Sequence, residues 1–308
     1  MIKGLAITPP VIGRISIGKL VQKQERWLPE KDDSFSLTTQ VQSREGWLLH
    51  PLHQALSEQA QNGKIRAIPI QLLFNDSELN LRAEYSAFDR NNGRPVCVGN
   101  GETARRVTSQ GMEEIGCMGP DRCPLTKELG CKLYGRLNVQ VEGQQDELGS
   151  FIFRTTGYNS VRTLAARLKY YEAASGGNTK HLPLLLRLRA KSTTQSHRTP
   201  VYYVDLTLRD GQTLAEAVST ARKTAEEQLE AGIDTAELEQ AARLLLQNGQ
   251  FEDTEEEVPQ LLEEFYPAGE GSDEVGEKPV NQHPILTTCQ RRILTRLSSP
   301  FLPLFEAV

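Results

Sequence analysis

The stretch SFIFRTTGYNSVRTLAARLKYYEAASGG, residues 150–177, passes from a strand pattern to a helix pattern. Its alternating start predicts a β-strand, because successive side chains of a strand point to opposite faces. Asn159 or Ser160 can cap the helix that follows, and Gly176–Gly177 can end it. Five apolar residues recur at helical spacing and would share one face of that helix: Val161, Leu164, Ala165, Leu168 and Tyr171.

The chain beyond this helix predicts two more strands and a second helix. LPLLLRLRAK (182–191) and PVYYVDLTLR (200–209) alternate in the way strands do. TLAE (213–216) matches a capping box and favours a helix that continues to about residue 230. The order strand, helix, strand, strand, helix over residues 148–230 predicts a compact α+β unit.

The first 90 residues are β-rich, with four extended segments at 13–21, 33–42, 64–74 and 79–88. Asn91-Asn92-Gly93 then predicts a tight hairpin, since these residues tolerate positive φ. The expected fold class is therefore α+β: a β-rich N-terminal part, a zinc-binding cysteine insert, the strand-helix-strand-strand-helix unit and a helical acidic C-terminal region.

The sequence suggests four parts along the chain. They are an α+β core at 1–230 with a cysteine insert at about 88–135, an acidic helical segment at 231–268, a disordered linker at 269–284, and a basic amphipathic C-terminal helix or tail at 285–308.

Charge is divided unevenly along the chain. Residues 226–278 hold 17 Asp and Glu against Arg243 and Lys278, a formal charge of -15. The rest holds 33 Lys and Arg against 23 Asp and Glu, or +10. A basic body joined to an acidic segment suggests contact with a polyanion or an acidic protein, or else a solvated acidic tail that adds solubility.

Targeting signals are not apparent. The start lacks a basic head followed by an apolar block, and no stretch approaches the ~20 apolar residues that span a bilayer. We expect a soluble, cytoplasmic protein without membrane contact. Thiols stay reduced in that compartment, which favours metal binding or catalysis over disulfides for a cysteine cluster.

Four of the five cysteines fall within 35 residues: Cys97, Cys117, Cys123 and Cys131. Glycine and proline frame them, and zinc prefers four tetrahedral thiolate or imidazole ligands. We expect a structural Zn²⁺ held by these four thiols, with buried unligated thiols as the alternative. His50 or His53 could replace Cys97. A fully ligated site leaves no place for a reactive water, and Cys289 stands apart as a core-facing thiol.

The strands at 182–191 and 200–209 would carry a basic face with an aromatic residue. Arg187, Arg189 and Lys191 alternate with leucines on one strand, and Tyr203 and Arg209 face outward from the other. Cations follow a phosphate backbone and aromatic rings stack on bases, so this surface predicts nucleic-acid contact. Asp205 would partly oppose it, and a solvated or helix-covered sheet face is the alternative.

The loop that joins these two strands adds His197 and Arg198 to the candidate nucleic-acid surface. Enzyme signatures are lacking: the chain has no phosphate-binding glycine-lysine loop, no dinucleotide fingerprint and no nucleophile elbow. Scattered histidines leave a metal-dependent hydrolase open as an alternative.

Several of these segments together resemble a known family. They are the FDR…GRPVC hairpin, the cysteine insert, FIFRTTGYNSVRTLAARL and TTQSHRTPVYYVDL. The family comes from phages and integrative elements and includes recombination directionality factors of large serine integrases; relatives in conjugative elements often carry the label "hydrolase or metal-binding protein". The resemblance covers roughly residues 1–225.

The resemblance implies a non-enzymatic accessory of DNA recombination, with the four cysteines as the metal site and no catalytic residue. A directionality factor binds its integrase on attachment-site DNA and favours excision over integration. The expected partners are double- or single-stranded DNA and possibly an integrase or other recombinase. A single-strand DNA-binding or annealing protein, which would form homo-oligomers on DNA, is the second hypothesis, and a metal-dependent hydrolase is the third.

Overall fold

The computed structural model describes residues 10–23, 26–43, 46–124, 126–192, 194 and 198–246. All of them belong to the first of two units into which the chain divides, residues 1–267 and 268–308. The acidic segment from residue 247, the linker and the basic C-terminal segment with Cys289 all lie outside the described residues.

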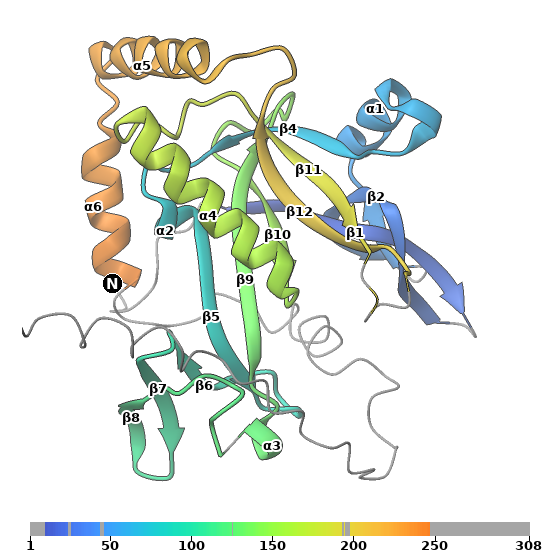
Figure 1. The fold of residues 1–308 in the computed structure, drawn as a ribbon, viewed down its shortest axis with the longest axis vertical. Coiled ribbons are helices and arrows are strands. Elements are labelled where there is room, and N and C mark those ends of the chain that lie inside the picture. Colours follow the sequence, from blue (N-terminus) through green and yellow to red (C-terminus); the bar gives the residue numbers. More distant parts are fainter. Residues whose placement is uncertain are drawn as a thin grey trace, which may run out of the picture. The chain divides into compact units, whose positions relative to one another are not determined.

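The described chain contains twelve strands and six α-helices (Figure 1). The strands are β1 (Val11–Lys23), β2 (Arg26–Ser43), β3 (Gly46–Leu49), β4 (Ala67–Leu72), β5 (Leu81–Phe88), β6 (Pro95–Gly99), β7 (Thr103–Thr108), β8 (Gly111–Gly116), β9 (Lys132–Val141), β10 (Ser150–Thr155), β11 (Leu184–Lys191) and β12 (Val201–Leu208). The helices are α1 (Pro51–Gln59), α2 (Ser77–Asn80), α3 (Thr126–Leu129), α4 (Tyr158–Ser175), α5 (Leu214–Glu230) and α6 (Thr235–Leu246).

Strand β9 is the centre of the sheet. It pairs with β10 on one side, and on the other side with β5 along its first half and β4 along its second half. Two branches therefore leave β9: β5-β6-β7-β8, and β4-β11-β12. On the opposite side the order continues through β10, β1, β2 and β3, and β1 pairs with β10 in parallel.

The sheet curls so that β2 contacts Ile65, which lies in the segment just before β4. The Phe35 N–H donates to the Ile65 carbonyl at 2.7 Å, and the Ile65 N–H donates to Ser34 Oγ at 3.0 Å. Strands β9, β10, β1, β2 and β4 thus follow one another around a ring. Their inner side chains form most of one hydrophobic core, in which Leu37, Ile70 and Leu137 have no exposed surface.

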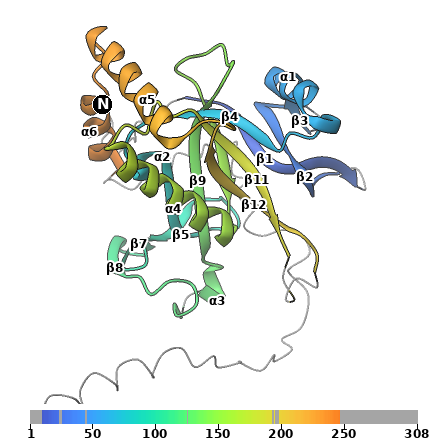
Figure 2. The ribbon, with the colours of Figure 1, turned by 45° about the horizontal axis from the view of Figure 1, so that its top comes forward.

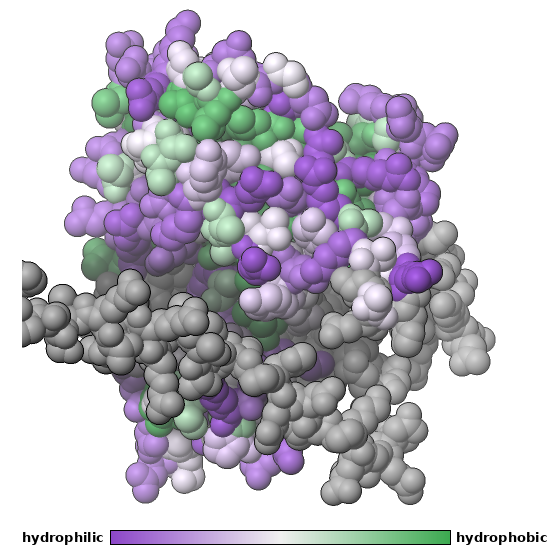
Figure 3. Space-filling view, viewed as in Figure 1, coloured by the Kyte–Doolittle hydropathy of each residue, from purple (hydrophilic) through white to green (hydrophobic). Residues whose placement is uncertain are grey.

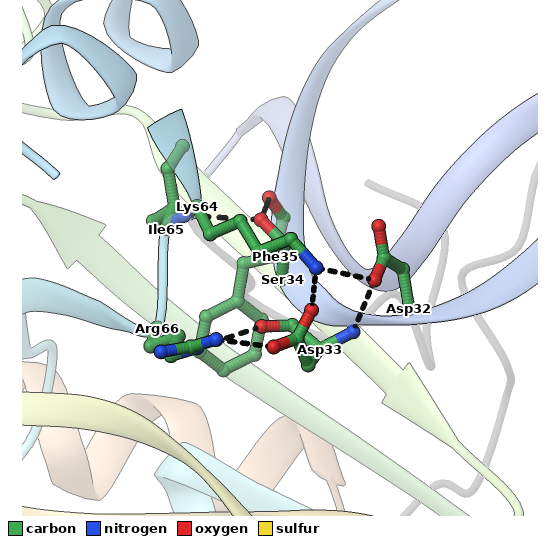
Figure 4. Close-up of polar contacts among 7 residues, drawn as sticks. All are labelled: Asp32, Asp33, Ser34, Phe35, Lys64, Ile65 and Arg66. Carbon is green, nitrogen blue, oxygen red and sulfur yellow. Dashed lines mark hydrogen bonds and ion pairs between the residues drawn. The ribbon is translucent and has the colours of Figure 1, made fainter. Parts of the chain in front are cut away.

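Charged side chains seal the point where this ring closes (Figure 4). Lys64 forms ion pairs with Asp32, at 3.1 Å, and with Asp33. Arg66 forms a third ion pair, also with Asp33. Hydrogen bonds from Lys64 first, and then from Arg66, hold the pKa of Asp33 well below its usual range. The same contacts raise the pKa of Lys64. The ion pairs therefore hold the edge of β2 against the start of β4.

Helix α4 packs on the core side of the sheet, next to β12 (Figures 1 and 2). Gly135 of β9 allows its close approach, because a Cβ there would lie 2.7 Å from Val161 Cγ2. Val161, Leu164, Leu168 and Tyr171 are buried, as the periodicity predicts, and Gly176 ends the helix with φ 67°. The order strand, helix, strand, strand, helix over residues 148–230 is confirmed as β10, α4, β11, β12 and α5.

The predicted N-cap of α4 is wrong, whereas its predicted end at Gly176 is right. The helix begins at Tyr158 with Gly157 as N-cap, so Asn159 and Ser160 lie within its first turn. The Ser160 hydroxyl accepts the Val204 N–H at 3.1 Å instead, and the Tyr171 hydroxyl donates to the Leu206 carbonyl at 3.3 Å. These backbone groups lie on the outer edge of β12, so α4 satisfies a strand edge that would otherwise invite further pairing.

Helix α5 follows its predicted range closely, and α6 lies within the segment predicted to be helical at 231–268. Thr213 and Glu216 form the predicted capping box at the start of α5. Helix α6 packs Ala242 against Leu73, Phe74 and Leu79, in a small core separate from the main one. In Figure 3 the visible face is mostly hydrophilic, and hydrophobic surface gathers between α5 and α4. No helix among the described residues is both long and apolar enough to cross a bilayer.

Candidate functional site

The four clustered cysteines lie in a segment that we call the cysteine arm, residues 95–131, which comprises β6, β7, β8 and α3 (Figure 1). The hairpin around Asn91-Asn92-Gly93 is present between β5 and β6, with Gly93 at φ 62°. A second hairpin, β7–β8, was not predicted. Alternation in TARRVT and MEEI around Ser-Gln-Gly is the signal that could have revealed it.

Strand pairing places Cys97 and Cys131 on either side of β5, next to Ala87. Cys97 of β6 pairs with Ala87 on one side. On the other side Lys132 of β9 pairs with Ser86, so Cys131, the residue before Lys132, lies beside Ala87. Ala87 is fully buried and has only a methyl group, which leaves room above it for two thiols.

Two turns bring in the other thiols. The Cys117 N–H donates to the Glu102 carbonyl at 2.8 Å, and the Cys123 N–H donates to the Gly119 carbonyl at 3.0 Å. Gly119, at φ 73°, reverses the chain between these two cysteines. Cys117 packs against the bare backbone of Gly99, because a Cβ on Gly99 would lie 2.7 Å from Cys117 Sγ.

The four thiols are near enough to affect one another. The pKa of Cys131 is raised to about 12, mainly by burial and in smaller part by the neighbouring thiols Cys97, Cys123 and Cys117. Burial also raises the pKa of Cys97, with Cys117 and Cys123 adding to it and Arg106 opposing. All four are free, half-buried thiols. A thiol with a raised pKa is a poor nucleophile at neutral pH.

The donor set suits a soft metal, but the side chains are not closed around a point. Within the described ranges, no group of three or more His, Cys, Asp or Glu side chains is arranged to hold a metal ion. The predicted substitutes are engaged elsewhere: His50 Nδ1 accepts the Leu52 N–H at 3.2 Å, and His53 Nδ1 accepts the Leu37 N–H at 3.3 Å. The four cysteines therefore remain the candidate metal ligands, as free thiols in this structure.

The arm contains very little hydrophobic core. Among its described residues only Gly99 and Ala104 are buried. Val107, Met112 and Met118 are 49%, 62% and 60% exposed. Hydrophobic burial therefore contributes little to the stability of this segment.

The predicted cationic residues do share one face of β11–β12. Arg187 is opposite Asp205, and Arg189 is opposite Tyr203. Arg198 is exposed in the joining loop, with φ 62°, and His197 lies outside the described residues. Lys191 Nζ donates to Asn159 Oδ1 at 2.6 Å, which joins the strand pair to the first turn of α4.

One expectation for this face is wrong, because Asp205 is buried rather than exposed. It retains 4% exposure beneath two arginines, with Arg167 Nε 3.0 Å from Oδ1 and Arg189 Nε 3.4 Å from Oδ2. Its Oδ1 also accepts the Leu206 N–H at 2.9 Å. The hydrogen bond to Asp205 raises the pKa of Arg167. The sequence could not show this, because Arg167 comes from α4.

Two more cations of this face, Arg187 and Arg209, also have acidic partners. Arg187 pairs with Asp210 at 2.8 Å, and Arg209 pairs with Glu142. We call this surface the β11–β12 face. It combines three carboxylates, Asp205, Asp210 and Glu142, with six cations, Arg167, Arg187, Arg189, Lys191, Arg198 and Arg209. Among the described residues of this face, cations therefore outnumber carboxylates.

A family model described as recombination directionality factor-like, the Gp3-like family, matches residues 12–209. That range spans well over half of the 308 residues, so the chain belongs to this family. The suspected family is confirmed, and with it a connection to DNA recombination. No curated protein and no solved structure matches the chain significantly.

Proposed function

We propose that this protein is a non-enzymatic accessory of DNA recombination that contacts DNA through the β11–β12 face. The observation that carries the proposal is the excess of six cations over three carboxylates on one surface. Arg189 and Lys191 lie in its exposed part, and phosphate contacts from such side chains supply sequence-independent affinity.

The experiment is a titration of duplex DNA at several salt concentrations. Each phosphate contact contributes roughly 0.9 to the slope of log K against log salt. The double variant Arg189→Gln, Lys191→Gln should lower that slope by about two and weaken binding to all sequences alike. Lys223→Gln on α5 is the matched control, because it removes one cation from a different element. Absence of binding at low salt overturns the proposal.

Single-strand binding is a second candidate, favoured by one observation. Tyr158, the first residue of α4, is 64% exposed and adjoins Asn159, the residue that holds Lys191. An exposed aromatic ring next to a cation can stack on an unpaired base, worth about 1–3 kcal/mol per base. A Tyr158→Ala variant that loses affinity for single strands and keeps it for duplex DNA would favour this candidate.

We further propose that Cys97, Cys117, Cys123 and Cys131 hold one structural Zn²⁺. The small buried content of the arm and the mutual proximity of the thiols support it. Bound zinc would fix the two hairpins and α3 as one rigid element and leave no coordination position for catalysis. Metal analysis of the purified chain should give about one zinc per chain, and Cys117→Ser should abolish it while Cys289→Ser does not. A zinc-free wild type overturns this part.

A further inference from the structure

Strand β5 lies beside the cysteines of the arm. It runs from the main core to the arm and pairs there with β6 (Figure 1). Ala87 of β5 pairs with Cys97 on one side and lies beside Cys131 on the other. Side chains two residues apart on a strand share one face, so Tyr85 points the same way as Ala87. Tyr85 is therefore the next side chain on the face that carries these two thiols.

Three glycines lie around the ring of Tyr85. Gly99 of β6 is its direct partner across the strands. A Cβ built on Gly101 would lie 3.7 Å from Tyr85 Cε2, and one built on Gly119 would lie 3.6 Å from the same atom. Gly101 has φ 100° and Gly119 has φ 73°, which are turn conformations that favour glycine. Two separate turns of the arm thus contact the edge of one aromatic ring.

These two turns hold the backbones of the two cysteines that strand pairing does not place. Gly101 precedes Glu102, whose carbonyl accepts the Cys117 N–H at 2.8 Å. The Gly119 carbonyl accepts the Cys123 N–H at 3.0 Å. Each turn therefore connects one of these cysteines to the tyrosine ring.

The four cysteines are thus positioned in two different ways. Backbone pairing on the two sides of β5 places Cys97 and Cys131, and this pairing continues the main sheet. Cys117 and Cys123 belong to turns that bury little apolar surface, and Met118 between them is 60% exposed. An aromatic ring offers a large contact area, which turns built on glycine cannot supply themselves.

We propose that Tyr85 is a positioning residue of the proposed zinc site. Its ring holds the turns of Cys117 and Cys123, so that their thiols face those of Cys97 and Cys131. The inference rests on that zinc site and adds the side chain behind the ligands that orients half of them. Loss of a residue that orients metal ligands typically weakens metal binding roughly 10–100-fold.

The zinc affinity of the full chain tests the proposal, measured by competition with a chromophoric zinc chelator. Tyr85→Ala should bind zinc roughly tenfold more weakly than the wild type. Tyr85→Phe keeps the ring and should bind as the wild type does. Tyr85→Leu keeps an apolar side chain without a ring, should resemble Tyr85→Ala, and replaces it if the alanine variant does not fold. Tyr202→Ala, the matched control, removes another partly buried tyrosine, on β12, and should leave zinc affinity unchanged.

A second readout separates positioning from general stability. Zinc-loaded protein is treated with limiting iodoacetamide, and mass spectrometry locates the first label on each chain. In Tyr85→Ala this label should reach Cys117 and Cys123 roughly fivefold faster than in the wild type, the factor that a modest loss of local stability gives. First labelling at Cys97 and Cys131 should keep its wild-type rate. Equal acceleration at all four thiols would overturn the proposal in favour of a general loss of stability.

The affinity measurement also distinguishes this inference from the zinc site on which it rests. Weaker binding in Tyr85→Ala that Tyr85→Phe restores supports the role of the ring. A wild type that binds zinc, with the same affinity in Tyr85→Ala, overturns the role of Tyr85 and leaves the zinc site standing. A wild type that binds no zinc overturns both.

Discussion

The strand ring and the cysteine arm belong to one sheet but are stabilised by different forces. Strands β1, β2, β4, β9 and β10 bury phenylalanine, isoleucine and leucine almost completely, each contributing about 1.5–3 kcal/mol on burial. Among its described residues the arm buries two glycine- or alanine-sized positions, Gly99 and Ala104, and exposes Val107 and Met112. Hydrophobic burial therefore stabilises the ring far more than the arm, where the proposed zinc site would have to supply the difference.

The largest effect on this contrast should come from metal removal. Structural zinc in small domains contributes about 10–16 kcal/mol of apparent binding free energy, which is folding free energy for the segment it holds. A strong chelator should make the backbone amides of residues 95–131 exchange rapidly while those of β9 and β10 remain protected. Hydrogen exchange read by mass spectrometry makes the comparison. Unchanged exchange in the arm would show that other forces hold it.

Truncation of an apolar side chain should lower the free energy of unfolding more in the ring than in the arm, the reverse of the effect of metal removal. Leu137→Ala in the ring, where the side chain is fully buried, should lower the free energy of unfolding by about 3 kcal/mol. Ile115→Ala on β8, which is half-buried, should lower it by about 1 kcal/mol or less. Denaturant titration of the metal-loaded proteins measures both values. Similar losses at the two positions would mean that the arm has a core of its own.

A smaller effect distinguishes buried from exposed charge on the β11–β12 face. Asp205→Ala should lower the free energy of unfolding by about 1–3 kcal/mol, because Arg167, Arg189 and the Leu206 N–H all lose their acceptor. This loss of stability stays moderate because both arginines reach solvent. Asp210→Ala, the control, removes an exposed partner of Arg187 and should change stability by about 0.5 kcal/mol or less. Equal effects would contradict the burial of Asp205.

The smallest effect concerns acid and the closure of the ring. Asp33 has a folded pKa below its ordinary value of 3.8, so its ion pairs stabilise the fold above about pH 4. That contribution is lost as pH falls through the folded pKa. At neutral pH the wild type should have a higher melting temperature than the Asp33→Asn variant. The difference between the two melting temperatures should shrink as the pH is lowered. A constant difference across that range would show that charge on Asp33 is not responsible.

Local pattern predicted much of this fold. The buried face of α4, the capping box of α5 and the hairpin before Cys97 each depend on residues close in sequence. Features that depend on distant pairing were missed or wrong. Ser160 looks like a helix cap, yet its hydroxyl accepts from Val204, 44 residues away. Asp205 looks exposed until Arg167 of α4 is placed over it.

The candidate surfaces divide in the same way. The cationic residues of β11–β12 alternate within one strand, so the sequence alone indicates their common face. The cross-strand neighbours Arg82, Arg136 and Arg154 cannot be read from the sequence, because these residues meet only when three strands adopt one register.

The sequence by itself determined the α+β class, the helix faces, the clustering of thiols and the division of charge, since each follows from residue type and local spacing. Tertiary structure alone decided that β9 is the centre of the sheet, that β2 closes on the chain before β4, and which charges meet. The physical reason is that side-chain alternation fixes the two faces of a strand but not the partner beside it. That partner is selected by packing and backbone hydrogen bonds across the whole sheet.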